Sequence, residues 1–168
     1  MIDGSMSPAI RPARPGDAGV VAELVRALAA YEKLDHAVES TSETLAAALF
    51  APEPRVFCDL VEADGEVIGF ALWFYTFSTF TGRHGIWLED LFVRPEARGK
   101  GAGKALLGHL ARRCVDEGLT RFEWAVLDWN APSIAFYKSQ GARLLDDWTT
   151  CRVDGPALVA LAGGEGAP

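Results

Sequence analysis

The segment from Arg98 to Gly103 constrains the fold of this chain most, because it has glycine at positions 99, 101 and 103. Glycine lets a backbone turn sharply and pass close to a ligand with its N–H groups exposed. The β-rich run Ile86–Val93 precedes the segment, and an amphipathic stripe that includes Leu106 follows it. The sequence therefore predicts a strand, a glycine turn and a helix whose N-terminus binds an anion.

The residues of this turn exclude two well-known phosphate-binding loops. A Walker A loop needs glycine at position 98 and Ser or Thr after its lysine, but the chain has Arg98, and Ala105 follows Lys104. A dinucleotide-binding fingerprint needs a third glycine where Leu106 stands. A glycine-rich turn that holds no ligand stays open as an alternative at this point.

Positive charge is concentrated around the turn in an otherwise acidic chain. The 168 residues have a net charge of −7, yet the range Arg94–Arg113 holds six basic residues and one acid. This distribution favours binding of a small anion at the turn. It argues against a nucleic-acid partner, because a duplex binder needs a broad basic face.

Hydrophobic periodicity predicts alternating helices and strands along one α/β domain. Asp64–Gly65 strongly predicts a two-residue hairpin turn. Ser40 and Glu43 predict a capping box at the start of a helix. We expect strands over residues 9–12, 56–63, 66–77, 86–93, 122–127 and 148–153, and helices around 17–28, 40–50, 102–118, 130–141 and 157–161. This order predicts a mixed sheet with helices on both faces.

The ends of the chain and its composition give further expectations. We expect a disordered leader over residues 1–8, a single domain over 9–162 and a flexible tail over 163–168. No signal-peptide pattern and no apolar run of membrane-spanning length is present, so we expect a cytoplasmic protein with no membrane partner. The three cysteines and three histidines are widely spaced, and we expect no metal site.

Several segments together are similar to one known family. The pattern R-x-x-G-x-G at Arg98–Gly103, behind its strand, resembles the pyrophosphate-binding motif of the GCN5-related N-acetyltransferases (GNAT), which use acetyl-CoA. The resemblance runs from Ile10 to about Val153 and is sharper to the diamine (spermidine/spermine) acetyltransferase group, within it to the branch that acetylates thialysine and related small amines. The segments that carry it are Tyr31–Leu34, Ser78–Arg83, Leu88–Val93 and Ala125–Asn130. Between Gly141 and Trp148 the chain is shorter than that group and has Asp146 and Asp147 instead of a Glu pair.

The resemblance implies a GNAT-like acyl-CoA N-acyltransferase fold, acetyl-CoA as cosubstrate, a small cationic amine as acceptor and a homodimer. It also implies which residues contact acetyl-CoA. The backbone of Leu91, Phe92 and Val93 would meet the pantetheine arm, the turn residues Arg98, Gly99, Lys100, Gly101, Ala102, Gly103 and Lys104 would hold the pyrophosphate, and Asn130 and Ser133 would hydrogen-bond further along the cosubstrate.

Acetyl transfer to an amine also requires proton transfers. An amine with a pKa of about 10 must lose a proton before it attacks, and a departing thiolate, with a thiol pKa of about 8.5, is helped by a proton donor. The resemblance makes Tyr137 this general acid; the alternative is a core aromatic beside Phe136. Glu89 shares a strand side with Trp87 and Leu91, so we expect it to be partly buried. It would deprotonate the amine through water or bind its ammonium group, unless it is a structural carboxylate.

The resemblance places the acceptor's positive charge among Tyr31, Glu32, Glu89 and Glu123, although Glu32 and Glu123 taken singly are equally typical of surface acids. Two competing functional classes stay open. The first is a GNAT enzyme that acts on a protein N-terminus, an aminoglycoside or an amino acid. The second is a non-catalytic module that binds acyl-CoA.

Overall fold

The structure, a computed structural model, describes residues 8–163. Residues 1–7 of the predicted leader and 164–168 of the predicted tail lie outside the described residues. The chain divides into two compact units, Met1–Leu127 and Asp128–Pro168.

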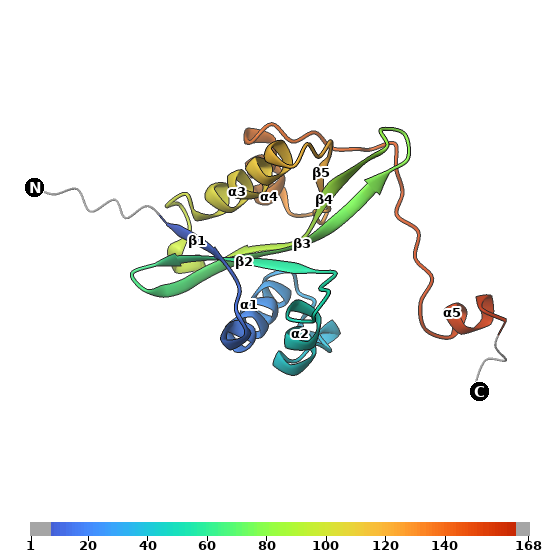
Figure 1. The fold of residues 1–168 in the computed structure, drawn as a ribbon, viewed down its shortest axis with the longest axis horizontal. Coiled ribbons are helices and arrows are strands. Elements are labelled where there is room, and N and C mark those ends of the chain that lie inside the picture. Colours follow the sequence, from blue (N-terminus) through green and yellow to red (C-terminus); the bar gives the residue numbers. More distant parts are fainter. Residues whose placement is uncertain (1–7, 164–168) are drawn as a thin grey trace, which may run out of the picture. The chain divides into compact units, whose positions relative to one another are not determined.

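The first unit is built on a five-stranded sheet whose strands follow one another in chain order (Figure 1). The strands are β1 (Ala9–Pro12), β2 (Phe57–Ala63), β3 (Glu66–Ser78), β4 (Arg83–Val93) and β5 (Phe122–Trp124). Strands β1 to β4 pair antiparallel, whereas β5 runs parallel to β4, which confirms the predicted mixed sheet. The turn between β2 and β3 has φ of 53° at Asp64 and 80° at Gly65, as the two-residue hairpin requires.

Helices cover both faces of this sheet. Helices α1 (Ala18–Tyr31) and α2 (Ser42–Leu49) lie on one face and α3 (Ala102–Asp116) on the other (Figure 1). Short 3₁₀ turns occupy Pro15–Asp17, Asp35–Ala37 and Pro95–Ala97.

The predicted capping box of α2 is wrong by one residue. Thr41, with the extended backbone that an N-cap needs, accepts a hydrogen bond from the Thr44 N–H at 3.2 Å. The Thr41 N–H in turn donates to the Thr44 hydroxyl at 2.9 Å. This threonine pair closes the helix start in place of Ser40 and Glu43.

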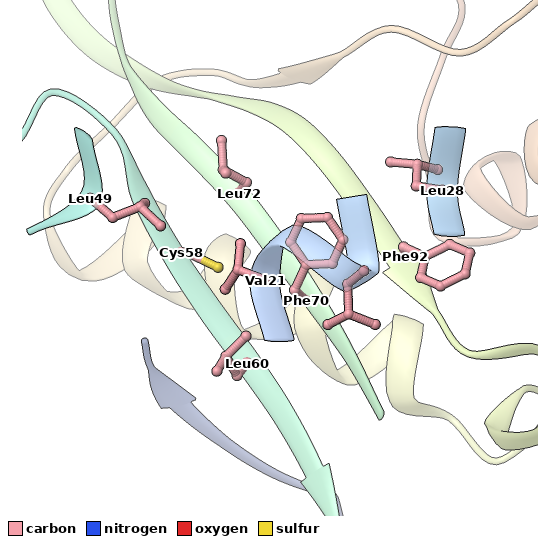
Figure 2. Packing of buried hydrophobic residues seen from close by; sticks show 9 residues of the cluster. Val21, Leu28, Leu49, Cys58, Leu60, Phe70, Leu72 and Phe92 are labelled. Carbon is pink, nitrogen blue, oxygen red and sulfur yellow. The ribbon is translucent and has the colours of Figure 1, made fainter. Parts of the chain in front are cut away.

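The main core lies between α1, α2 and the sheet (Figure 2). Period-2 alternation sends every second residue of β2 and β3 to this side. The core consists of Val21, Leu24, Leu28, Leu49, Cys58, Leu60, Phe70, Leu72 and Phe92.

The opposite face holds α3 through polar contacts as well as apolar ones. Buried Asp59 accepts a hydrogen bond from the indole of Trp73 at 2.8 Å, and His109 Nε2 of α3 lies 3.6 Å from Asp59 Oδ1. One turn further along α3, the Arg113 guanidinium stacks over the Trp73 ring at 5.0 Å. Because these contacts fix α3 on the sheet, they also fix the glycine turn at its start.

The second unit contains α4 (Ala131–Ser139) and α5 (Gly155–Leu161). The strand predicted over residues 148–153 is wrong: this segment has no regular structure, and every residue from Arg143 to Gly163 is exposed. A β-rich sequence becomes a strand only where a neighbouring strand accepts its backbone hydrogen bonds. The strand predicted over 122–127 is likewise shorter than expected and ends at Trp124.

Candidate active site

The glycine turn has the backbone geometry that its sequence predicts. Gly99 and Gly101 have φ of 77° and 84°, in the left-handed region that favours glycine. A Cβ built on either residue would meet nothing within 4 Å. Backbone conformation, rather than crowding, therefore demands glycine here, and the space beside both residues is open to a ligand.

Helix α3 begins at this turn with no acidic side chain in its first turn and no side-chain cap, because its N-cap is Gly101. The first N–H groups of a helix have no partner inside the helix, and the helix dipole makes this end attractive to anions. Lys100 and Lys104 are exposed on either side of the start. The turn and helix together form an arrangement that can hold a phosphate group.

Arg98 contacts two aromatic rings from other elements. Its guanidinium carbon is 5.0 Å from the ring centre of Tyr31, the last residue of α1, and 5.4 Å from that of Phe92 on β4. Its Nε–H donates to the Val93 carbonyl oxygen at 2.9 Å. The structure thus brings three predicted cosubstrate residues together with a residue predicted for the amine side.

Strand β4 contains a β-bulge that changes the expected position of Glu89. Leu72 pairs with Asp90, but the next residue of β3, Trp73, pairs with Leu88, so Glu89 is left out of the register. The prediction that Glu89 is partly buried is wrong: it is exposed, and its carboxylate accepts a hydrogen bond from the Trp87 indole at 2.8 Å. The prediction assumed an unbroken period-2 alternation of side chains along β4, and the bulge interrupts this alternation at Glu89.

Asp90 is the carboxylate that the bulge turns inward. It is half-buried, and burial raises its pKa from 3.8 to about 7, with smaller contributions from the negative charges of Glu89 and Glu32. A carboxyl group that titrates near neutral pH is suited to proton transfer. The sequence analysis did not single out Asp90. The available signal was that Glu89 and Asp90 are consecutive acids on one strand, so that in a period-2 alternation they occupy both faces.

Glu32 is one of the residues that the sequence analysis predicted for the amine side. It follows α1 directly, it is half-buried, and burial raises its pKa above the ordinary value of 4.5. Its charge also contributes to the raised pKa of Asp90, as does that of Glu89. Three carboxylates from two elements are therefore electrostatic neighbours in this unit.

The pairing between β4 and β5 stops at the bulge. The parallel register runs from Ile86 with Phe122 to Leu88 with Trp124, and no strand within residues 8–163 continues it on that side of β4. The backbone of Leu91 and Val93, predicted to meet the pantetheine arm, belongs to this stretch.

Glu123 belongs to the paired part of β5. It is in register with Trp87, the residue whose indole holds the Glu89 carboxylate, and it is half-buried. Side chains of residues in register lie on the same face of a sheet. Glu123 is therefore a neighbour of Trp87 on the strand next to Glu89.

The second unit carries the other predicted site residues on α4. Buried Asn130 is the N-cap, and its side-chain oxygen accepts from the Ser133 backbone N–H at 3.3 Å. Tyr137 is half-buried two turns into the helix, with its ring centre 5.4 Å from that of Phe136. Both the predicted cap and the predicted helix are thus present.

Two further features of the described chain bear on function. None of the helices within residues 8–163 has the length and apolar character needed to cross a bilayer. In the same range, no three His, Cys, Asp or Glu side chains gather in a way that could hold a metal ion.

Comparison with known families agrees with the fold and with the glycine turn. The profile of the Acetyltransferase (GNAT) family matches residues 20–142, which include the bulged strand, the turn and α3. The chain belongs to the GNAT acetyltransferase family and is an N-acetyltransferase. Members of this family use acetyl-CoA.

Individual relatives are similar over nearly their whole length. A thialysine N-epsilon-acetyltransferase of Sus scrofa is 39% identical over 165 residues, covering 92% of this chain and 96% of the relative. An L-ornithine N5-acetyltransferase of Arabidopsis thaliana is 30% identical, covering 90% and 86%. An integron cassette protein from the mobile metagenome of V. cholerae has a similar solved structure, with a TM-score of 0.76 and 30% identity over 94% of this chain and 98% of that one. These similarities confirm the predicted resemblance to the thialysine branch of the diamine acetyltransferase group.

Proposed function

We propose that the protein transfers the acetyl group of acetyl-CoA to a primary amine of a small substrate that carries a second positive charge. Diamines, polyamines and amino acids with a thialysine-like side chain belong to this class. The observation that carries the proposal is the acidic group of Glu32, which follows α1, and Glu89 and Asp90, which lie at the bulge of β4. The glycine turn follows β4 after one short 3₁₀ turn. The glycine turn would bind the anionic phosphates of the CoA thioester, and the acids at the bulge would bind the cationic amine.

On the cosubstrate side, phosphates would be bound by the backbone N–H groups of the turn and by the cationic side chains of Arg98, Lys100 and Lys104. The residues Gly99, Gly101, Ala102 and Gly103 keep side chains out of this space. The backbone of Leu91, Phe92 and Val93 is proposed for the pantetheine arm because β5 does not pair with β4 there. Asn130 and Ser133 are proposed on the resemblance alone.

On the amine side, the reaction is proposed as direct attack. The amine nitrogen gives up a proton and forms a bond to the acetyl carbonyl carbon, and the carbon–sulfur bond then breaks. We assign the proton to Asp90, whose raised pKa makes its carboxylate a better base at neutral pH than an ordinary acid. The thiolate takes its proton from the Tyr137 hydroxyl, a role that rests on the resemblance.

The remaining acids would bind the second positive charge of the substrate. Glu89 is exposed, and the hydrogen bond from the neutral Trp87 indole orients its carboxylate. Glu32 and Glu123 complete this cation subsite, with Tyr31 beside Glu32. The names of the thialysine and ornithine relatives support an acceptor of this kind.

A substrate screen tests the proposal. Purified protein and acetyl-CoA are mixed with putrescine, spermidine, thialysine, lysine, an aminoglycoside and a short peptide, and free thiol release is followed. We expect release with small dications above that with monoamines. Preferred turnover of the peptide or the aminoglycoside would assign the enzyme to another acceptor class, and no turnover with any amine would leave a module that only binds acyl-CoA.

We also propose a homodimer in the cytoplasm. Large apolar side chains of the second unit are exposed, among them Trp148 at 80% and Leu161 at 74%, and a second copy of the chain would cover them. Three free cysteines suit a reducing compartment. Light scattering on the full chain tests the dimer, and the double variant Trp148→Ser with Leu161→Ser should shift it to monomer.

A further inference from the structure

Arg98 of the glycine turn has an aromatic support from another element. Tyr31 ends α1 far away in sequence, yet its ring centre lies 5.0 Å from the Arg98 guanidinium carbon. The Phe92 ring lies 5.4 Å from the same carbon, and the Val93 carbonyl accepts from Nε. Two rings and one hydrogen bond therefore fix the side chain of an exposed arginine.

None of these three contacts uses the edge of the Arg98 guanidinium that would bind a ligand. The two ring contacts are made by the guanidinium carbon, and Nε–H is used by Val93. The Nη1 and Nη2 groups, which carry the remaining donors, form the fork that binds a phosphate in two places. An arginine that is already ordered loses less side-chain entropy when it binds an anion.

We infer that Tyr31 is a positioning residue for Arg98, and that its ring raises the affinity of the glycine turn for the phosphates of CoA. This inference rests on the proposed cosubstrate site but differs from the substrate role that the resemblance implies for Tyr31. A residue that serves only the amine has no effect on CoA binding when no amine is present. A residue that holds Arg98 does.

Calorimetric titration with CoA in the absence of any amine separates the two roles. We expect Tyr31→Leu to raise the dissociation constant of CoA about three- to fivefold, the scale of one exposed cation–π contact. Tyr31→Phe keeps the ring and should stay within twofold of the wild type. The matched control Phe80→Leu changes an aromatic residue that is 93% exposed in the same unit and should have no effect.

A double-mutant cycle shows whether the effect passes through Arg98. Arg98→Ala should weaken CoA binding about tenfold, and adding Tyr31→Leu to it should change nothing more. A structural role of Tyr31 would instead give additive losses and a lower unfolding midpoint of the single variant. Unchanged CoA binding in Tyr31→Leu, equal losses in the Leu and Phe variants, or additive losses in the cycle would each overturn the inference.

The result is independent of the acceptor amine. If CoA binding follows the expected pattern while no amine supports thiol release, the proposed function fails and the role of Tyr31 stands. If amines are acetylated but Tyr31→Leu binds CoA like the wild type, the proposed function stands and the inference fails.

Discussion

Glu89 and Asp90 are neighbours in the chain, but a bulge in β4 gives their carboxylates opposite environments. Glu89 is exposed and bonded to an indole, whereas Asp90 is half-buried with a pKa of about 7. A half-buried acid with a raised pKa is suited to proton transfer, whereas an exposed carboxylate is suited to binding a cation. The assignment of Asp90 to proton transfer and Glu89 to cation binding follows from this difference.

The acid limb of the pH profile should belong to Asp90. Only the carboxylate form accepts a proton, so kcat/KM for the amine should fall as the pH drops below about 7. Asp90→Asn should lower kcat about 10²-fold, the usual scale for a general base, and remove the limb. The profile is measured at saturating acetyl-CoA and corrected for the fraction of free amine.

The charge of Glu89 allows a second test of the acid limb of the pH profile. The negative charge of Glu89 contributes to the raised pKa of Asp90, so Glu89→Gln should move the limb to lower pH. Glu53 is exposed and is not among the charges that raise the pKa of Asp90, so Glu53→Gln removes the same charge and should leave the limb in place. A limb that ignores both Asp90→Asn and Glu89→Gln would assign the proton transfer elsewhere.

Asp90 should also make stability depend on pH without any substrate. Its pKa is higher in the folded state than the ordinary 3.8, so the folded protein binds the proton more tightly and loses stability as pH rises from about 4 to about 7. Asp90→Asn removes this loss. Chemical denaturation should therefore give a stability difference, variant minus wild type, that grows over this interval and is constant above it; a constant difference throughout would contradict the raised pKa.

The glycine turn should tolerate no side chain at position 101 when CoA binds. Gly101→Glu places a bulky negative group in the open space beside the helix start and should weaken CoA binding at least 10²-fold by calorimetry. Gly82→Glu is the control, because Gly82 also has a positive φ, of 62°, with nothing within 4 Å, and it lies in the hairpin before β4 rather than after that strand. Both variants carry the backbone strain, and wild-type affinity in Gly101→Glu would remove the turn from the cosubstrate site.

Tyr137→Phe removes one hydroxyl from α4 and keeps the ring beside Phe136. If the hydroxyl protonates the leaving thiolate, kcat should fall about 10²-fold while the dissociation constant of CoA stays within twofold. Single-turnover kinetics measures the chemical step directly. Equal single-turnover rates in the two proteins would make Tyr137 a packing residue.

The cation subsite should distinguish dications from monoamines. Glu32→Gln with Glu123→Gln should raise KM for a diamine about tenfold, equivalent to about 1.4 kcal/mol, and affect a monoamine of equal length less. The pair Glu53→Gln with Glu66→Gln removes two exposed charges elsewhere and serves as control. Equal effects on both amines would mean that Glu32 and Glu123 supply only a general negative field.

Much of the fold and part of the site could be predicted because local sequence patterns carry them. Helix stripes, the Asp64–Gly65 turn and the glycines of the Arg98–Gly103 segment act through the conformations that their own residues adopt. The family resemblance added Tyr137 and the residues of the amine side. None of these required knowledge of which strands pair.

Only the tertiary structure decided the features that depend on pairing between distant segments. The bulge at Glu89 arises from the register of β4 against β3; Asp90 beside it is half-buried, and the pairing of β5 with β4 ends at Trp124. The support of Arg98 by Tyr31 arises where the end of α1 meets the turn. A single sequence encodes each segment's preference, but register and contact result from the packing of whole elements, and packing overrode the β-rich pattern over residues 148–153.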